Sequence, residues 1–404
     1  MHILLGLKRA HLGIYAIAAV LTGCSAASQG ASSLPASYAG TDPLRSSANA
    51  NMLLALEASG ELPGPVPRQA FQWQLQHIRN EPRPRAFHGD TAKVAMWASY
   101  IGYSELLGLD RKASKVLVSI DTFANNCLAP NTVKVDHNQN IWIACNELNA
   151  GHTADFGGQQ EYSRSGKVER SYVFDASRHC GRGYRFCGAG SWDGGWDNKG
   201  HVFAELSAGV WFGDGPDHYM SPGFYWWNSN DPSGPGTFIR ASHYCKPFCN
   251  VYYMDTDSSG NIWFDFADEP NPYGHGGLGE VTNPTSARSV KIVLPAGTYG
   301  FPGGVYVSGH GTVLNVTDQN QRETYQYHLP VTPSSTAFNV LGLTVGLPVS
   351  GGFNKTESAF VLGNYASGLI NIGKLPVNRW STKGCGLKGY ESPCTGAAFT
   401  PSDK

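Results

Sequence analysis

A pattern of four short strands separated by turns occurs twice in succession between Val251 and Pro330. In the first unit, the β-rich segment 251–255 is followed by Asp257-Ser-Ser-Gly260, and a second strand-like segment continues over 261–265. Asp and Ser hydrogen-bond the backbone locally and Gly tolerates positive φ, so this tetrapeptide predicts a tight turn. Two further strand-like segments complete the unit, and a second set of four begins at Phe301. Repeated units of four short strands are typical of β-propeller blades.

The turn and the second strand of this unit recur along the rest of the chain. Asp136-His-Asn-Gln-Asn140-Ile-Trp matches Asp257-Ser-Ser-Gly-Asn261-Ile-Trp at the Asp, Asn, Ile and Trp positions. Further copies lie at 197–204 and 311–315, and weaker copies lie at 93–98 and 358–362. The six units predict an all-β chain that forms a β-propeller of six four-stranded blades, although the degenerate outer copies leave five or seven blades open.

The composition fits this fold and argues against two classes of binding partner. The 404 residues include 49 Gly and 12% aromatic residues but only 15% charged residues, which suits turns and aromatic-rich strands rather than amphipathic helices. The 30 basic and 31 acidic residues nearly balance. The sequence therefore gives no sign of nucleic-acid binding or of a polybasic membrane patch.

The first 23 residues have the organisation of an export signal. Lys8 and Arg9 precede the apolar segment 12–21, which is short for a membrane span. The segment ends in Leu21-Thr-Gly-Cys24, which resembles the bacterial lipobox. The resemblance implies that Cys24 is lipidated and that Ser25 directs the protein to the outer membrane of a cell that has one. An ordinary signal peptide, cleaved nearby, is the alternative.

The chain is therefore expected to have four parts. They are a lipoprotein signal peptide at 1–23, a flexible Ser/Ala/Pro-rich tether at 24–85, a β-propeller at 86–380, and a C-terminal tail with a local disulfide at 381–404. We expect the lipid to be the only membrane contact, and we expect a monomer.

The repeated phrase Val135-Asp-x-x-x-Asn-Ile-Trp-Ile-Ala144 resembles NHL-type and SMP-30-like six-bladed propellers. The resemblance is strongest to an uncharacterised bacterial lipoprotein branch of that group and covers roughly residues 86–375. The matching residues belong to the strands and turns. The resemblance therefore implies the architecture and does not by itself imply a function.

The cysteines predict disulfides. Nine Cys are present, and Cys24 of the lipobox leaves eight in the exported protein. Close spacing suggests three local pairs, and the propeller topology brings two remaining cysteines to one face. The expected pairs are Cys180–Cys187, Cys245–Cys249, Cys385–Cys394 and Cys127–Cys145. Zinc binding is the alternative, since His179 and His243 lie near cysteines.

The propeller topology also predicts where a ligand site lies. Neighbouring strands are antiparallel, so the start of each first strand and the end of each second strand share one face. The polar residues expected on that face, around the channel mouth, are Asn146, Glu147, Glu205, Asp268, Glu269, Asp318 and Asn364. Glu147, Glu205, Asp268, Glu269 and Asp318 are the candidate metal ligands among them. No nucleophile elbow, zinc-protease helix, P-loop or dinucleotide fingerprint is present.

Two functional classes remain. The first is a binding or interaction scaffold on the cell envelope, without a cofactor, which recognises a protein, a glycan or a small molecule. Tyr219, Phe224 and Tyr273 are its first candidate anchors, although the run 224–227 is also expected to pack between blades. The second is implied by resemblance to SMP-30-like lactonases and streptogramin-type lyases. It is a metal-dependent hydrolase or lyase in which Ca²⁺, Mg²⁺ or Zn²⁺ at the channel mouth orients the substrate.

Overall fold

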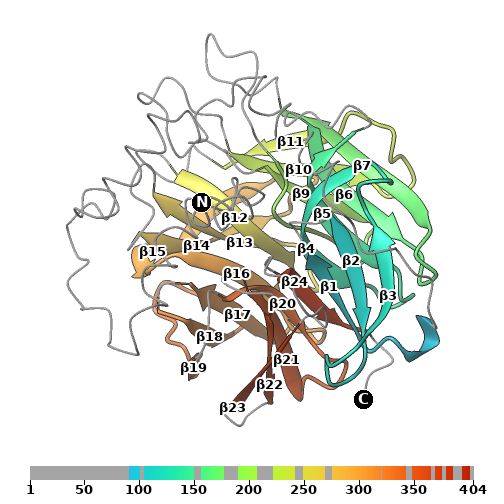
Figure 1. Ribbon diagram of the computed structural model, residues 1–404. Coiled ribbons are helices and arrows are strands. Elements are labelled where there is room, and N and C mark those ends of the chain that lie inside the picture. Colours follow the sequence, from blue (N-terminus) through green and yellow to red (C-terminus); the bar gives the residue numbers. More distant parts are fainter. Residues whose placement is uncertain are drawn as a thin grey trace, which may run out of the picture.

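The chain forms a six-bladed β-propeller (Figure 1). The computed structural model describes residues 91–100, 104–149, 156–176, 190–206, 222–241, 249–268, 275–319, 321–342, 348–364, 369–374, 379–384 and 394–400. A short 3-10 turn, η3 (Thr91–Lys93), precedes the first strand of the described part. No helix in these ranges is long and apolar enough to cross a membrane.

Each blade is a sheet of four antiparallel strands. The first blade, from the innermost strand outward, is β24 (Cys394–Phe399), β1 (Met96–Tyr100), β2 (Glu105–Leu109) and β3 (Val116–Asp121). The second is β4 (Cys127–Val135), β5 (Ile141–Leu148), β6 (Phe156–Tyr162) and β7 (Val168–Asp175). The third is β8 (Gly194–Trp196), β9 (His201–Leu206), β10 (Gly223–Asn228) and β11 (Thr237–Arg240).

The second half of the ring continues the same order. The fourth blade is β12 (Cys249–Thr256), β13 (Ile262–Asp268), β14 (Gly276–Thr282) and β15 (Ser289–Tyr299). The fifth is β16 (Pro302–Val307), β17 (Val313–Asp318), β18 (Glu323–His328) and β19 (Asn339–Gly342). The sixth is β20 (Pro348–Phe353), β21 (Ala359–Asn364), β22 (Leu369–Lys374) and β23 (Arg379–Gly384). The copies at 93–98 and 358–362 are thus second strands, β1 and β21, as the alignment predicts.

The C-terminal strand closes the ring. β24 pairs antiparallel with β1, with Met96 opposite Phe399 and Ala98 opposite Ala397. The predicted boundary at residue 380 is therefore too early, and the segment 381–404 is not only a tail. Its last strand supplies the innermost position of the first blade, which has no other strand there. Closure of this kind protects sheet edges that would otherwise be exposed at the start of the ring.

The repeated Asp is a turn cap that also orients the repeated Trp. Asp257 accepts hydrogen bonds from the backbone N–H groups of Ser259 and Asn261 at 2.9 and 3.0 Å, and from Trp263 Nε1 at 3.1 Å. Asp136 does the same for the backbone of Asn140 at 2.8 Å and for Trp142 Nε1 at 3.2 Å. The Asp and Trp positions are therefore coupled, which explains why they recur together.

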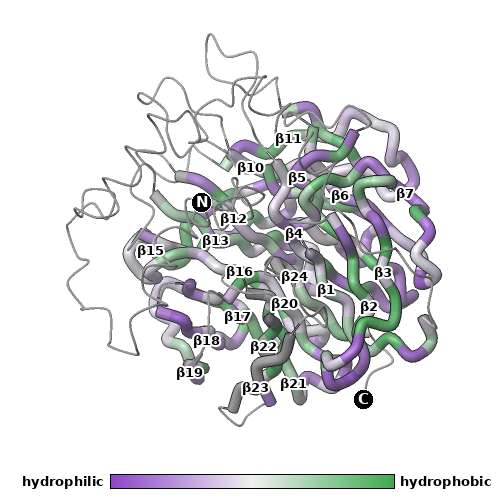
Figure 2. The backbone as a smooth tube through the Cα atoms, in the orientation of Figure 1, coloured by the Kyte–Doolittle hydropathy of each residue, from purple (hydrophilic) through white to green (hydrophobic). Residues whose placement is uncertain are grey.

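Aromatic side chains fill the space between blades. Trp142 of the second blade stacks on Trp196 of the third, with ring centroids 5.3 Å apart. Phe224 is fully buried and packs against Phe264 of the fourth blade at 5.1 Å. The expectation that Phe224 anchors a ligand is therefore wrong, because its ring belongs to the core between two blades. Figure 2 shows hydrophobic stretches along the strands and a hydrophilic turn between β2 and β3.

One predicted disulfide is confirmed. Cys127 at the start of β4 is bonded to Cys145 in β5, with the Cα atoms 5.4 Å apart. The other three pairs involve cysteines or side chains outside the described residues, and they stay predictions. The same holds for the signal peptide, Cys24 and the tether, all of which precede residue 91.

Candidate functional site

The side of the propeller where first strands begin and second strands end is here called the mouth face, and the opposite side is called the turn face. Strand register confirms that the two ends coincide: Cys127 lies opposite Leu148, and Pro302 lies opposite Asp318. The turns that carry Asp136 and Asp257 lie on the turn face.

The predicted site residues lie at or near the mouth ends of their strands, and the structure describes the side chains of only some of them. Glu147 and Asn146 are buried near the end of β5. Glu205 is fully buried in β9, and Asp318, also fully buried, ends β17. Asp268 and Asn364 end β13 and β21, but their side chains lie outside the described part of the structure, as does all of Glu269.

Asp318 is used to hold the chain's own backbone. It accepts hydrogen bonds from the backbone N–H groups of Gly300, Phe301 and Gln321. Gly300 and Phe301 lead into the first strand of its own blade, so Asp318 fixes the connection from the fourth blade to the fifth. This role explains its complete burial, because a buried carboxylate needs such donors.

Glu205 is held in a similar way through one oxygen. Its Oε2 accepts the backbone N–H of Trp192 at 2.9 Å, while Oε1 has no hydrogen-bond partner among the described residues. Burial raises the pKa of Glu205 well above its usual range, and the nearby charge of Asp193 adds to this, against the hydrogen bond from Trp192. Glu205 therefore favours its neutral, protonated form.

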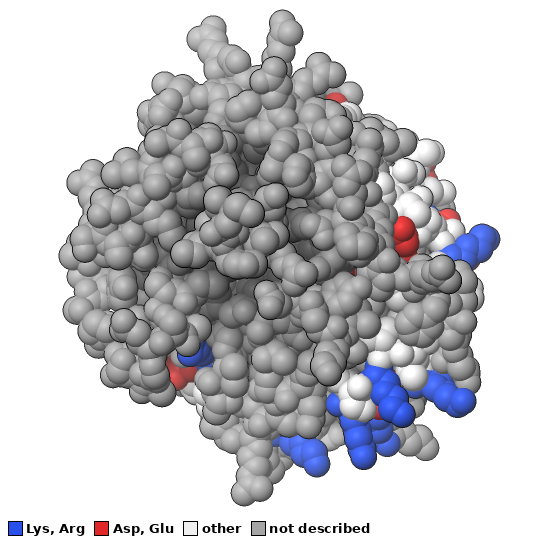
Figure 3. Space-filling model, viewed as in Figure 1, with Lys and Arg blue, Asp and Glu red and all other residues white. Residues whose placement is uncertain are grey.

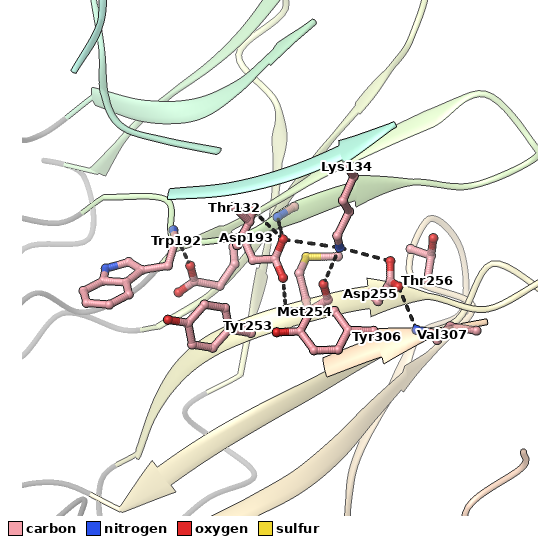
Figure 4. Close-up of polar contacts among 12 residues, drawn as sticks. Thr132, Lys134, Trp192, Asp193, Tyr253, Met254, Asp255, Thr256, Tyr306 and Val307 are labelled. Atoms are coloured by element: carbon pink, nitrogen blue, oxygen red, sulfur yellow. Dashed lines mark hydrogen bonds and ion pairs between the residues drawn. The ribbon is translucent and has the colours of Figure 1, made fainter. Parts of the chain in front are cut away.

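Three charged residues from three blades meet among the innermost strands (Figure 4). Lys134 of β4 lies 3.3 Å from Asp193 Oδ1 and 3.0 Å from Asp255 Oδ1 of β12. Its Nζ also donates to the carbonyl of Met254 at 2.7 Å. The side chain of Asp193 is fully buried, and those of Lys134 and Asp255 are 12% and 18% exposed. We call these three residues the axial cluster.

Gly195 lies beside the axial cluster. A Cβ at this position of the third blade would lie 3.7 Å from Asp255 Oδ1 and 3.8 Å from Lys134 Nζ. The glycine therefore leaves the space in which a lysine of the second blade reaches an aspartate of the fourth. A larger side chain at 195 would occupy that space.

Aspartate side chains also join neighbouring blades through hydrogen bonds. Asp193 accepts from Thr132 Oγ1 at 2.8 Å on one side and from the Met254 N–H at 3.1 Å on the other. Asp255 accepts from the Val307 N–H at 2.8 Å, and Asp265 from the Gly304 N–H at 3.0 Å. These carboxylates therefore link the second, third, fourth and fifth blades around the axis.

The electrostatics of these carboxylates follow from their burial. Burial raises the pKa of Asp193 to about 6, although Lys134 lowers it, and the charge of Asp255 adds to the increase. Burial likewise raises the pKa of Asp265 well above its usual range, against the hydrogen bond from the Tyr253 N–H. The described residues contain no group of three or more His, Cys, Asp or Glu arranged to hold a metal ion. The donor set thus does not fit a metal centre in this part of the chain.

The sequence analysis did not identify the axial cluster. One signal could have indicated it: Lys134, Gly195 and Asp255 each stand two residues before the turn Asp of their repeat. At this position the second and fourth blades carry a charged residue, and the third blade, which lies between them, carries a glycine. Lysine, aspartate and glycine are all depleted in strands.

The known proteins that resemble this chain do so in fold. No protein-family model and no curated protein matches the sequence. A structure from a nidogen/laminin complex is 11% identical, with a TM-score of 0.50 over 76% of this chain and 98% of that chain. A regucalcin from Agrobacterium tumefaciens strain C58, described as a calcium-binding protein, is 12% identical, with a TM-score of 0.45 over 69% of this chain and 80% of that chain. A putative gluconolactonase is 12% identical, with a TM-score of 0.41 over 65% and 79%. At these identities the likeness concerns the fold and not the chemistry.

Proposed function

We propose that this protein is an envelope-anchored binding scaffold that recognises a partner on its mouth face and catalyses no reaction there. The observation that carries the proposal is that acidic side chains at the mouth end of the blades accept hydrogen bonds from the chain's own backbone. Asp318 accepts three backbone N–H groups, and Glu205 accepts one while burial favours its neutral form. Both were candidate metal ligands, and both have structural partners within the chain.

The complete burial of Glu205 disfavours metal binding at this position, because it raises the energy of the ionised carboxylate that a cation needs. Because the blades are joined by buried hydrogen bonds, the scaffold beneath the mouth face is rigid. A rigid scaffold lowers the entropy that is lost when a partner is bound.

The first test replaces Glu205 by Gln, which keeps the shape and a neutral donor. A binding role predicts that the variant folds and binds like the wild type. A metal-dependent hydrolase or lyase predicts that turnover is lost. Hydrolysis of gluconolactone is measured with Ca²⁺, Mg²⁺ or Zn²⁺ present, and metal-dependent turnover that disappears in Glu205→Gln would replace the scaffold proposal by the enzyme.

The second test locates the binding face in cells. A photo-crosslinking amino acid is placed at His275, an exposed residue at the mouth end of the fourth blade, or at His137, an exposed residue of the turn face. We expect a specific adduct from position 275 and none from position 137. Adducts from position 137 alone would place the partner on the wrong face for the proposal.

A further inference from the structure

The fold separates the charges that balance in the sequence. Among the described residues, ten acidic side chains are buried, and no lysine or arginine is. The buried acids are Glu105, Asp136, Glu147, Glu161, Asp193, Asp197, Glu205, Asp265, Glu280 and Asp318. The nearly equal totals of acidic and basic residues therefore do not describe the surface, where the basic residues are in excess in this part of the chain.

Basic residues gather at one place on that surface. Figure 3 shows Lys and Arg side chains near the ends of β2 and β3 and beside η3, at the lower right of the view. The turn between β2 and β3 carries Arg111, Lys112 and Lys115, all exposed, and the exposed Lys93 ends η3. The turn between β6 and β7 adds Arg164 and Lys167. We call these six residues the basic rim.

Contacts between its segments show that the rim is continuous across two blades. Arg164 donates to the carbonyl of Ala92 at 3.2 Å, which joins the β6–β7 turn to η3. A Cβ at Gly166 would lie 2.8 Å from the side chain of Ile120, so the same turn also packs closely on β3. Asp110 accepts hydrogen bonds from Ser114 and from the Lys115 N–H, and Glu169 lies 3.8 Å from Lys167. The six basic residues of the rim outnumber these two acids.

We propose that the basic rim docks on an anionic lipid surface. The position of the rim favours this partner over a nucleic acid or an acidic protein, because the chain enters the propeller at η3, within the rim itself. Residues 24–90 precede η3 and are expected to lead back to a lipidated Cys24. A polybasic surface beside the point of attachment gains about 1 kcal/mol per basic residue close to an anionic membrane.

The docking has a geometric consequence. Both turns of the rim connect third and fourth strands, and such turns lie on the turn face, as do the turns between first and second strands. Contact through the rim would therefore bring the turn-face edge of the first and second blades to the lipid and keep the mouth ends of these two blades away from it. The proposal concerns another face than the partner site, but it rests on the envelope anchor of the proposed function, since a lipidated Cys24 is what places a lipid surface beside the rim.

The test is vesicle cosedimentation of residues 24–404 with Cys24→Ser, so that the protein carries no lipid. The vesicles contain phosphatidylcholine alone or with 30% phosphatidylglycerol. We expect binding to the anionic vesicles at low salt and its loss at high salt, because salt screens exposed charges. Failure to bind the anionic vesicles at low salt would overturn the proposal.

Two charge-matched variants place the contact. Replacing Arg111, Lys112 and Lys115 together by Gln is expected to weaken binding roughly hundredfold, from the sum of three surface charges. The control replaces Lys199, Arg240 and Arg288, which are exposed on the third and fourth blades, and is expected to bind like the wild type. Equal losses in both variants would show general charge attraction and overturn docking through the rim. Tighter binding to single-stranded RNA than to vesicles would also overturn it. Unchanged thermal unfolding shows that each variant is folded.

Discussion

Replacing Lys134 by Met would remove the cation that Asp193 and Asp255 share. The ammonium group lies 3.3 and 3.0 Å from the two carboxylates, and Asp193 is completely buried. Removing one partner of a buried ion pair typically costs about 3–5 kcal/mol, because the remaining charge stays buried without compensation. Methionine keeps most of the length and apolar stem of lysine, so the loss reports on charge and hydrogen bonding. With an unfolding entropy scaled to about 300 residues, this corresponds to a melting temperature lower by about 5–8 °C.

The pH dependence distinguishes this mechanism from simple loss of packing. The pKa of Asp193 is raised in the folded protein, from 3.8 to about 6. A carboxyl group with a raised folded pKa contributes most stability below its unfolded pKa, and this contribution is lost as the pH rises through the folded pKa. Without Lys134 the folded pKa of Asp193 should rise further. We therefore expect the difference in stability between Lys134→Met and wild type to be small near pH 4 and largest near pH 8.

Thermal and denaturant unfolding from pH 4 to 8 would measure the difference. Lys167→Met is a suitable control, because Lys167 is 77% exposed and pairs with Glu169 only at the surface. It is expected to change stability by less than about 0.5 kcal/mol. A Lys134→Met effect that is the same at every pH, or below about 1 kcal/mol at pH 8, would refute the electrostatic argument. Combining Lys134→Met with Asp193→Asn should recover part of the loss.

Four further predictions follow from the fold and the sequence. Gly195→Leu should separate the axial cluster and lower the melting temperature, whereas Gly195→Ala should be tolerated, since its Cβ lies at ordinary contact distances. Asp257→Ala should cost about 2–3 kcal/mol in denaturant unfolding through its lost turn and tryptophan hydrogen bonds, and a loss below 0.5 kcal/mol would contradict the capping role. Deleting residues 394–404 removes β24 and should abolish the cooperative unfolding transition of the ring, while a cooperative transition would show that closure is dispensable. Cys24→Ser should release the protein from membranes in cell fractionation or block its maturation, and an unchanged distribution would contradict the lipobox prediction.

Much of the architecture could be predicted because its determinants are local. The Asp at the turn, the Asn four residues later and the following Ile-Trp are all close in sequence, and each contributes to one turn and one strand. The spacing of these elements was sufficient to predict six blades as the best count, four strands in each, and the face shared by Cys127 and Cys145. The face on which Glu205 and Asp318 lie followed from the same antiparallel rule.

The roles of the buried residues could not be predicted in this way. Glu205 and Asp318 have the chemistry of metal ligands in the sequence, but in the fold they meet backbone N–H groups. Phe224, in a Gly- and Pro-flanked aromatic run, has the composition of a binding surface but packs against Phe264. The place of β24 was missed because its partner, β1, lies at the opposite end of the propeller sequence.

The sequence by itself thus determined the repeat, the turns and the strands within each continuous repeat, since these depend on residues close to one another in the chain. Only the tertiary structure decided which charges are buried and which face solvent. Lys134 and Asp255 are 121 residues apart in the sequence, and they meet only because the ring brings three blades to one axis. In the described part of the chain, the same closure buries ten acids and leaves the lysines and arginines partly or fully exposed. Acidic side chains of the same type are therefore buried and hydrogen-bonded in one place and exposed to solvent in another. Burial, and not residue type, sets the energy of each charge.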